Sequence, residues 1–519
     1  MVRHYGFGWY RLLAHGPTGV SALMLRVAVF VLMTMMAVSC SSAADVAADR
    51  TAPTAIVEPT MAPTVAPPAP TAQPTATATP TATPVPEPTA TSTPVPTPQP
   101  EGPCDAGPLA LPDPDRPVYT GAIEVDPTAR TVSGDVAVVF TPDLAIDDVY
   151  IRLWPNGPRT AAGGVQMELT SAVVDGVDTP FDMVDATTVR VGLAAQLPAN
   201  DSVEIAVGFE LLIPSELKSR ISARDDYMRL GTILPILPWE PGRGWALEPA
   251  TGLFAEAVSS PVADYTIQVV VPEGFDVLAS GVIDDDGAWH VESARDFALS
   301  VGRFRTVTGI AMAPEPVQVT VGVHDTINDD PEVYLAKIID SLEQFSQRWG
   351  QYPWPSLTFG VTPALSGGIE FPTHIMQGPN TQGRVTSHEV GHMFFYSLVG
   401  NNQGSAPWLD EGITSYAEFT YEGTPANAFE IPAGGVGNAT EPMTFWEGRA
   451  DIYYRSVYAQ TGFALQRLGD QADVDCALAR YVAANAHRIA TAEDFVAAFE
   501  PTFPDIVEQL AQLGVVIAE

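Results

Sequence analysis

The chain has 519 residues, of which 62 are acidic and only 25 are lysine or arginine, so its formal net charge at pH 7 is −37. A surface this acidic repels phosphate groups, which argues against nucleic acid and anionic lipid surfaces as partners. About 415 residues follow the N-terminal segments described next, which is enough for two or three domains with ordinary hydrophobic cores.

Residues 1–40 are typical of an export signal. Three arginines precede a short apolar run at 27–39, which is too short to span a bilayer as a finished helix. The small residues before Cys40 resemble the lipobox of bacterial lipoproteins, in which the cysteine is lipidated after cleavage. We therefore expect a lipoprotein-type signal peptide and a lipid anchor at Cys40, on the extracellular side of the cell membrane. The alternative is ordinary cleavage nearby, which would release a secreted protein.

Residues 41–104 have the composition of a spacer. Proline, threonine and alanine dominate this segment, and it has few large apolar side chains to bury. Such a sequence forms no core, and proline favours extended conformations. We expect a disordered, semi-rigid stalk that separates a globular part from the membrane.

The chain has three cysteines. If Cys40 carries lipid, Cys104 and Cys476 remain. Outside the cytoplasm these two could form a disulfide or stay as isolated thiols. None of the three has the spacing of a metal ligand.

Residues 105–310 are predicted to be a β-rich N-terminal domain. Apolar residues alternate or run together between breaks at proline, glycine and aspartate. The expected strands are 118–125, 131–140, 149–153, 202–209, 265–271 and 297–301. The segment has no convincing helical periodicity and no cluster of metal-binding residue types, so we interpret it as a binding or scaffold domain.

Residues 311–519 change to a helical period. Apolar residues at three- and four-residue spacings predict an amphipathic helix over 335–349, ended by Gly350 and Pro353. A short strand at 357–361, a glycine-rich loop at 366–372 and a helix at 384–399 follow. Later helices are expected at 411–421, 452–468, 474–484 and 494–499, the last one capped by Thr491.

Residues 388–392, within the expected helix at 384–399, have the sequence His-Glu-Val-Gly-His. Two histidines four residues apart leave one helix face one turn apart, which lets their nitrogens bind one zinc ion. Glu389, beside them, is a candidate general base. Glu411, nineteen residues after His392, begins the next helix and is the candidate third ligand. We therefore expect one Zn²⁺ at His388, His392 and Glu411, with one position open for water.

The alternative for this motif is a helix with two solvated or core histidines and an exposed glutamate. The chain has only eight histidines, so a chance match is rare. The position of Glu411 further favours the zinc interpretation.

These motifs resemble the aminopeptidase N family of zinc metallopeptidases. Residues 367–372 stand where that family has G-x-M-E-N, and residues 388–411 match its H-E-x-x-H-x18-E. In the β-rich half, residues 256–265 and 294–298 are similar to the family's N-terminal saddle domain. The resemblance implies an α+β multidomain fold. An all-β saddle-like domain would be followed by a thermolysin-like, mainly helical catalytic domain with a small mixed sheet.

The resemblance also implies roles for residues outside the zinc motif. Glu370 corresponds to the glutamate that holds the substrate's free α-amine, and Gly367 and Gly368 would line the substrate site. Tyr454 resembles the tyrosine that hydrogen-bonds the oxyanion, with Tyr453 as the alternative. Glu418 lies two turns after Glu411 and could support a zinc ligand or be an ordinary exposed residue.

The chain departs from the family pattern at several points. Ile369 replaces methionine and Phe371 replaces asparagine in the glycine-rich motif, and Arg455 replaces the usual lysine after the tyrosine. The chain ends about fifty residues after Gly469, so we expect no large C-terminal helical domain and a more open cleft.

The sequence thus predicts an exported, lipid-anchored zinc aminopeptidase that acts on peptides. One alternative is a zinc endopeptidase with an open cleft. The other is a catalytically degenerate, surface-displayed peptide-binding protein, which the intact ligands and Glu389 disfavour. The oligomeric state has no signal in the sequence.

Overall fold

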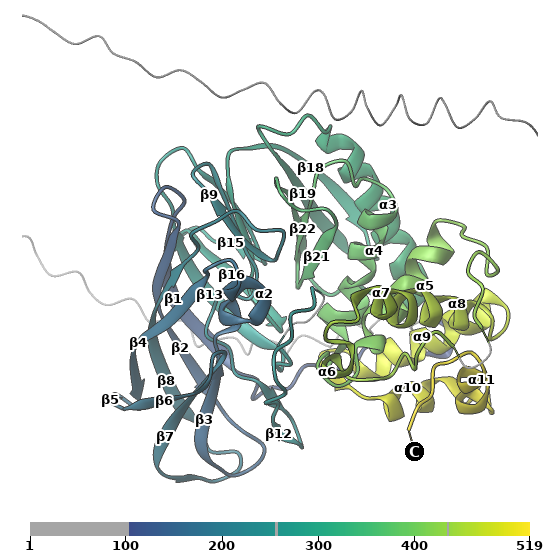
Figure 1. The fold of residues 1–519 in the computed structure, drawn as a ribbon, viewed down its shortest axis with the longest axis horizontal. Helices are drawn as coiled ribbons and strands as arrows, with labels where there is room; N and C mark the ends of the chain where they lie inside the picture. The colour runs from purple at the N-terminus through teal and green to yellow at the C-terminus, as the bar shows by residue number, and fades with distance from the viewer. Residues whose placement is uncertain (1–102, 255–257, 433–434, 519) are drawn as a thin grey trace, which may run out of the picture. The chain divides into compact units, whose positions relative to one another are not determined.

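A computed structural model describes residues 103–518 of the chain, apart from residues 255–257 and 433–434. The expected signal peptide, Cys40 and all but the last two residues of the expected stalk lie outside the described residues. The described part is an α+β protein in which a strand-rich region is followed by a mainly helical region (Figure 1), as the sequence predicts.

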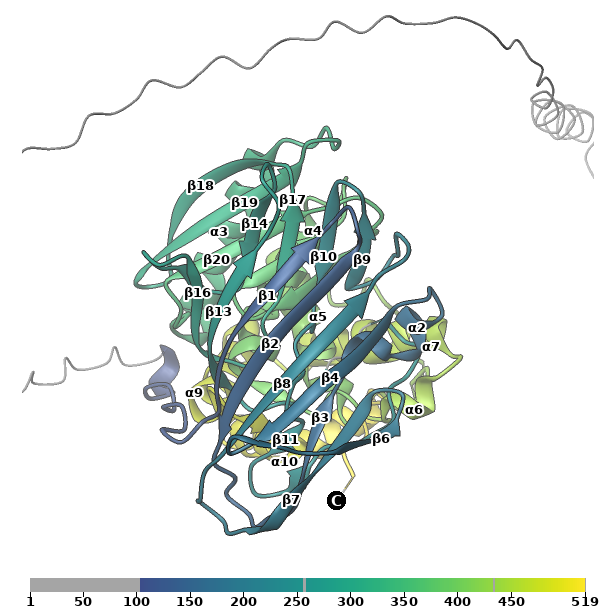
Figure 2. The same ribbon diagram turned by 90° about the vertical axis from the view of Figure 1, so that its left-hand side faces the viewer.

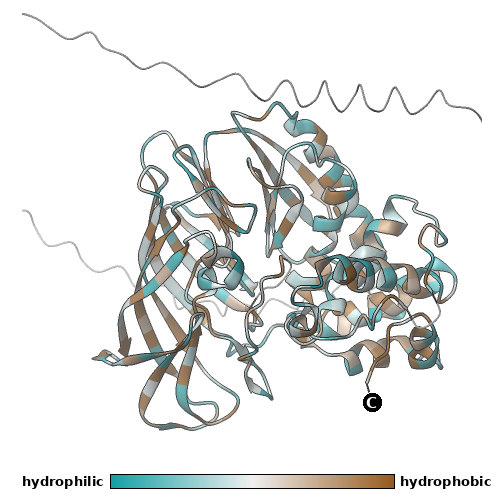
Figure 3. Ribbon diagram, in the orientation of Figure 1, coloured by the Kyte–Doolittle hydropathy of each residue, from teal (hydrophilic) through white to brown (hydrophobic). Residues whose placement is uncertain are grey.

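An eight-stranded sheet is the largest element of the strand-rich region, with the strand order β15-β16-β13-β1-β2-β8-β4-β5. Neighbouring strands are antiparallel except β1 and β13, which are parallel. Figure 2 shows the sheet face-on, and Figure 3 shows hydrophilic and hydrophobic residues alternating along its strands. Alternation buries one face of each strand and exposes the other. Its strands are β1 (Val118–Asp126), β2 (Thr131–Phe140), β4 (Gln166–Val174), β5 (Val177–Asp178), β8 (Val203–Leu212), β13 (Ala263–Val270), β15 (Val282–Ile283) and β16 (Ala288–Ala294).

Smaller sheets and short helices complete the strand-rich region. A three-stranded sheet has the order β3-β7-β6, a four-stranded sheet has the order β14-β17-β10-β9, and β11 pairs with β12. Their bounds are β3 (Ile146–Arg152), β6 (Phe181–Asp185), β7 (Thr188–Leu197), β9 (Ile221–Arg224), β10 (Tyr227–Leu230), β11 (Trp239–Glu240), β12 (Gly244–Trp245), β14 (Asp276–Ala279) and β17 (Leu299–Gly302). The short helices are η1 (Pro103–Asp105), η2 (Trp154–Asn156) and α2 (Pro158–Ala161). All six expected strands are present, as β1, β2, β3, β8, β13 and β17, but the prediction missed several others, including β4, β7 and β16.

A five-stranded mixed sheet opens the second region, with the order β18-β19-β20-β22-β21. Its three inner strands are parallel and its two edge strands are antiparallel to their neighbours. The strands are β18 (Phe304–Met312), β19 (Pro316–His324), β20 (Ser356–Val361), β21 (Gly368–Phe371) and β22 (His374–Gln377). The predicted division at residue 310 falls inside β18, which forms a hairpin with β19 and shares its register. The expected loop at 366–372 is instead largely the edge strand β21.

Helix α3 (Pro331–Trp349) packs beside this sheet and confirms the predicted amphipathic helix. Its N-cap Asp330 accepts a hydrogen bond from the backbone of Glu332, and the helix ends at Gly350, whose φ of 115° favours glycine. The apolar stripe from Leu335 to Trp349 is buried.

The helix expected over 384–399 is shorter than predicted. Helix α4 (Arg384–Gly391) gives way to the π-type turn η3 (Met393–Leu398), inside which Phe395 and Tyr396 have non-helical backbone angles. The reason is packing. Phe394 and Phe395 both contact the ring of Trp349, and a regular helix turns successive side chains about 100° apart.

The remaining helices cover the four predicted segments, with 452–468 divided into three elements, and include three short helices that the sequence did not predict. They are η4 (Pro407–Leu409), α5 (Glu411–Tyr421), α6 (Met443–Trp446), α7 (Ala450–Tyr453), η5 (Tyr454–Gln460), α8 (Thr461–Gln466), α9 (Gln471–Asn485), α10 (Ala492–Phe499) and α11 (Ile506–Gln512), with β23 (Gly400–Asn401) paired to β24 (Ile489–Ala490). The predicted cap at Thr491 is confirmed, because Thr491 and Asp494 exchange hydrogen bonds in a capping box. Within residues 103–518, outside the two short gaps, none of the helices combines the length and apolarity that a bilayer crossing requires.

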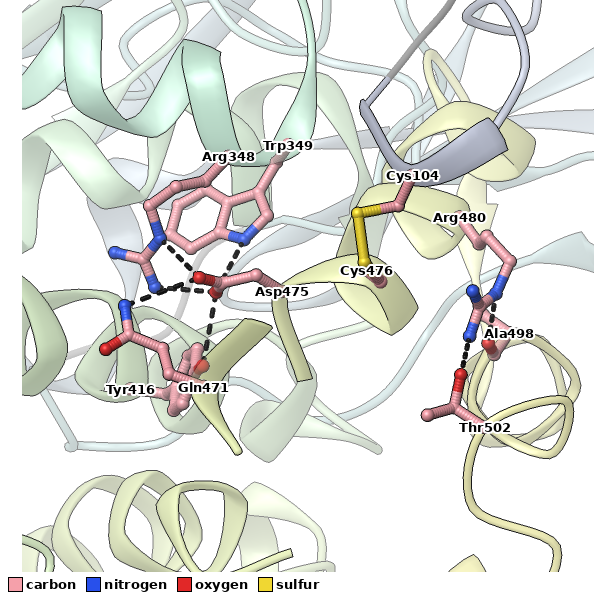
Figure 4. The surroundings of a disulfide bond; sticks show 10 residues. All are labelled: Cys104, Arg348, Trp349, Tyr416, Gln471, Asp475, Cys476, Arg480, Ala498 and Thr502. Atoms are coloured by element: carbon pink, nitrogen blue, oxygen red, sulfur yellow. Dashed lines mark hydrogen bonds and ion pairs between the residues drawn. A yellow bond between two sulfur atoms is a disulfide. The ribbon is translucent and has the colours of Figure 1, made fainter. Parts of the chain in front are cut away.

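Cys104 and Cys476 form a disulfide between η1 and α9 (Figure 4), which decides between the two alternatives left by the sequence. It joins residues 372 positions apart. Next to it, the carboxylate of Asp475 accepts hydrogen bonds from the side chains of Arg348 and Trp349 on α3. The start of the described chain is thus fastened to the helical region.

Candidate metal centre

The structure brings the three predicted zinc ligands together. His388 lies on α4, His392 caps its C-terminal end, and Glu411 is the first residue of α5 (Figure 1). The two Nε2 atoms are 3.1 Å apart, and they lie 3.2 and 3.3 Å from Oε2 of Glu411. Ligand atoms about 2.0–2.1 Å from one zinc ion in a tetrahedron are about 3.3–3.4 Å apart. The arrangement therefore fits zinc.

Two carboxylates orient the histidine rings. Nδ1 of His388 lies 3.1 Å from Glu418, and Nδ1 of His392 lies 2.6 Å from Asp410. Because an ionised carboxylate only accepts hydrogen bonds, each Nδ1 donates and each Nε2 presents its lone pair to the centre. Pairing of a histidine ligand with a carboxylate is the usual support of a zinc site.

The centre attracts positive charge. Burial alone lowers the pKa of His388, but hydrogen bonds to Glu411 and Glu418 raise that pKa to about 10. Burial acts to raise the pKa of Glu411, whereas His392 and hydrogen bonds from both histidines hold it at about 2. The carboxylates thus favour a cation here, which a divalent metal supplies.

Glu389 lines the same cavity as the zinc ligands. The side chain is buried, and its Oε2 has no hydrogen-bond partner in the described part of the chain. Burial raises the pKa of Glu389 to about 8, although His388 and His392 act in the opposite direction. A buried, unpaired carboxylate with a raised pKa is suited to accept and return a proton.

The glycine-rich segment borders this carboxylate. A Cβ atom on Gly368 would lie 2.3 Å from Cδ of Glu389, so only glycine leaves room for the glutamate. A Cβ on Gly367 would meet nothing within 4 Å. Gly367 and Gly368 both line the cavity of the metal centre, where the sequence places them.

Glu370 is brought close to the metal ligands by the edge strand β21. One of its carboxylate oxygens lies within 4.8 Å of a ring nitrogen of His392 and of a carboxylate oxygen of Asp410. Burial raises the pKa of Glu370, and the charges of His392 and Arg220 oppose that effect. A carboxylate thus stands beside the site of reaction, where an ammonium group could pair with it.

The tyrosine nearest the centre is one that the sequence analysis did not select. The hydroxyl of Tyr458 donates a hydrogen bond to Oε1 of Glu411, and its ring stacks on His388 with centroids 5.7 Å apart. Tyr454, one turn earlier on η5, lines the same cavity and is 40% exposed. Tyr453 is buried. The signal that could have found Tyr458 is its four-residue spacing from Tyr454, which puts both on one helix face.

A cavity of 540 Å³ opens onto the centre. Residues of the strand-rich region form part of its lining. The rest includes the metal ligands, Glu389, Glu370, Gly367, Gly368, Tyr454 and Tyr458. The cavity volume is in the range of small-molecule and peptide sites.

The supporting residues were only partly found from the sequence. Glu418 is buried and hydrogen-bonded to His388. Of the two alternatives for Glu418, support of a zinc ligand therefore fits the structure, and an ordinary exposed residue does not. Asp410 was missed, although it directly precedes Glu411 and its side chain is fully buried.

Comparison with solved structures identifies the fold. An M1 zinc metallopeptidase from Deinococcus radiodurans is similar over 78% of this chain and 95% of that one, with a TM-score of 0.55 and 18% sequence identity. A variant of an M1 zinc metallopeptidase from the same organism, bound to a Tyr-Ser-Ala substrate, gives a TM-score of 0.57. The chain has the M1 zinc metallopeptidase fold. The resemblance to the aminopeptidase N family is therefore confirmed at the level of the fold.

Sequence comparison with curated proteins points to the same M1 group. Rat aminopeptidase B is 24% identical over 281 residues, which are 47% of this chain and 42% of that protein. Mouse aminopeptidase B is 23% identical over the same length. The chain thus matches less than half the length of these relatives. No protein-family model matches the chain.

Proposed function

We propose that the protein is a zinc aminopeptidase that releases the N-terminal residue of peptides. One observation carries the proposal: a buried carboxylate, Glu370, lies within 4.8 Å of a ring nitrogen of the zinc ligand His392 and lines the cavity that holds the metal centre. As part of the proposal, the strand-rich region is a saddle-like domain and the helical region a thermolysin-like catalytic domain. The M1 fold of the neighbours supports both assignments.

The metal ligands and Glu389 perform the central chemistry. His388, His392 and Glu411 would hold zinc, which when bound would supply a Lewis acid for the peptide carbonyl and lower the pKa of a water molecule. Glu389 accepts the proton of the attacking water and delivers it to the amine of the leaving peptide. Its free, buried Oε2 supports this role.

Glu370 sets the position of the cut. Its carboxylate pairs with the α-ammonium group of the substrate and holds the first peptide bond at the centre. Glu370 lies on β21, which is an edge strand of the five-stranded sheet. An extended peptide can add to such an edge through main-chain hydrogen bonds.

Tyr458 stabilises the developing oxyanion. Its hydroxyl donates a hydrogen bond to the zinc ligand Glu411. In the proposed mechanism the side chain of Tyr458 rotates away from Glu411, and the hydroxyl then donates to the carbonyl oxygen of the substrate. Tyr454, the residue chosen from the sequence, lies on the same wall of the cavity and is the competing candidate.

The test compares a short peptide that has a free amino terminus with its N-acetylated twin. The wild type should cut only the free form, and Glu370→Ala should lose most of this activity while it keeps its zinc. Equal cleavage of both forms would identify an endopeptidase. Binding of peptides without cleavage would identify a degenerate, peptide-binding scaffold.

The proposal includes export and a lipid anchor at Cys40. It is supported by the apolar run at 27–39 and by the proline- and threonine-rich residues that follow. In a bacterial host, the wild type should sediment with membranes, and Cys40→Ala should not. Release of both proteins into the medium would contradict the anchor.

A further inference from the structure

Three cationic side chains gather on the wall of the cavity that the strand-rich region forms. They are Arg159 on α2, and Lys218 and Arg220 in the segment before β9. Lys218 is one of only two lysines in a chain whose net charge is −37. This wall of the cavity is therefore locally basic, although the protein as a whole is strongly acidic.

Among the described residues, none of these three cations lies within ion-pair distance of a carboxylate, although the charge of Arg220 opposes the rise that burial causes in the pKa values of the carboxyl groups of Asp296 and Glu370. Arg384, the fourth basic residue of the cavity, differs because it pairs with Glu418. Arg220 is only 7% exposed, and its one hydrogen-bond acceptor among the described residues is the backbone carbonyl of Phe254, at 3.1 Å. A guanidinium has five N–H donors, and the described residues accept from only one nitrogen of Arg220.

Phe254 holds the two arginines in place. Its carbonyl binds Arg220, and its ring lies 5.0 Å below the guanidinium carbon of Arg159. Arg159 in turn donates to the backbone carbonyl of Lys218 at 3.0 Å. These contacts orient Arg159 and Arg220 and add no negative charge, because carbonyls and rings carry no net charge.

The cavity is therefore polarised. Carboxylates, including Glu370, lie on the side of the metal centre, and the three cations lie on the side of the strand-rich region. A ligand that fits has an ammonium group at one end and a negative group at the other. The desolvation free energy of an anion bound beside these three cations is offset, because guanidinium and ammonium groups replace the hydrogen bonds that water made to it.

We propose that Arg159, Lys218 and Arg220 bind a carboxylate of the peptide substrate. This inference rests on the proposed aminopeptidase function and adds a substrate class, which is peptides with a carboxylate near their amino terminus. Two sources have this chemistry. One is the terminal carboxylate of a di- or tripeptide, and the other is the side chain of an acidic residue.

The test uses four peptides: Ala-Ala-Ala, its C-terminal amide, Glu-Ala-Ala amide and Gln-Ala-Ala amide. The wild type should show a kcat/KM on the order of tenfold higher for the carboxylate member of at least one pair. A preference within the first pair identifies the terminal carboxylate, and one within the second identifies the acidic side chain. In Lys218→Gln and Arg159→Gln this preference should shrink several-fold, and the double variant should nearly abolish it.

The matched control is Arg303→Gln. Arg303 is half-exposed and pairs with Asp325, and it does not line the cavity. Its preference should equal that of the wild type. Arg220 is left unchanged in these variants, because its buried contacts make its removal a risk to folding.

A binding measurement separates this inference from the proposed function. In a Glu389→Gln background, calorimetry with the same four peptides gives dissociation constants without turnover. Cleavage of all four peptides at equal rates by the wild type would overturn the inference and leave the aminopeptidase function intact. An unchanged preference in the double variant would overturn it too. If no peptide is cut, the proposed function fails, while the carboxylate preference in binding still tests the three cations.

Discussion

The two walls of the cavity hold their functional side chains in different ways. On the helical wall, His388 and His392 are each fixed by a hydrogen bond to a buried carboxylate. On the strand-rich wall, the cations are held by a backbone carbonyl and an aromatic ring, and Lys218 is exposed.

The difference follows from what each wall does. Bond cleavage depends on atoms placed within a few tenths of an ångström, so its residues need a second layer of charged partners. Binding of a carboxylate does not need such precise placement, because the flexible side chain of a lysine can adjust to the position of the carboxylate. Substitutions on the helical wall should therefore cost catalysis, and those on the opposite wall should change substrate preference.

The largest effect in this comparison is expected for Tyr458→Phe. Removing the hydroxyl takes away a donor for the oxyanion, and kcat should fall by about 10²–10³-fold with little change in KM. Tyr454→Phe is the matched control and should lose much less. Steady-state kinetics on one tripeptide decides between the two tyrosines, and a larger loss in Tyr454→Phe would return the role to that residue.

The substitution Gly368→Ala should lower the catalytic rate although it changes no metal ligand. Its Cβ would lie 2.3 Å from the Glu389 carboxyl carbon, so Gly368→Ala must displace the base. A displacement of about 1 Å can cost about 10²-fold in rate. Gly367→Ala, whose Cβ has open space, should lose less. The rate and the zinc content are measured for both variants. If both variants keep their zinc and lose the same factor in rate, displacement of Glu389 is not the cause.

Asp410→Asn should weaken zinc binding. The change keeps the shape of the side chain but removes the charge that orients His392, and loss of such a partner typically lowers metal affinity about 10–100-fold. Competition with a chelator measures the affinity. An affinity equal to that of the wild type would mean that Asp410 serves packing alone.

The smallest effect on the cavity is expected from the disulfide, because neither cysteine lines it. Replacing Cys104 and Cys476 by serine frees a loop of hundreds of residues, which should lower stability by about 2–4 kcal/mol. Thermal unfolding should shift downward while kcat/KM below the transition stays constant. A matching loss of kcat/KM would show that the disulfide also shapes the site.

Features set by local patterns were predictable from the sequence. The helix spacing of His388 and His392, the start of α5 at Glu411 and the cap at Thr491 all depend on neighbouring residues. Features set by long-range packing were not. The break after Gly391 depends on Trp349 of another helix, and β21 is a strand only because β22 pairs with it.

The same distinction explains the residues missed in the site. Asp410 and Tyr458 have no motif of their own, and their roles become visible only where the fold places them against His392 and Glu411. The cation at 159 lies in a different segment from those at 218 and 220, so no spacing in the sequence joins all three at one cavity.

The central claim is that zinc and Glu389 together make this cavity an active site. The most direct measurement is hydrolysis of a tripeptide with a free amino terminus by the wild type and by Glu389→Gln, with zinc content determined on both samples. We predict one zinc per chain in each protein and a rate about 10²–10⁴-fold lower in the variant. Equal rates in the two proteins, or a zinc-loaded wild type that cuts no peptide, would contradict the account.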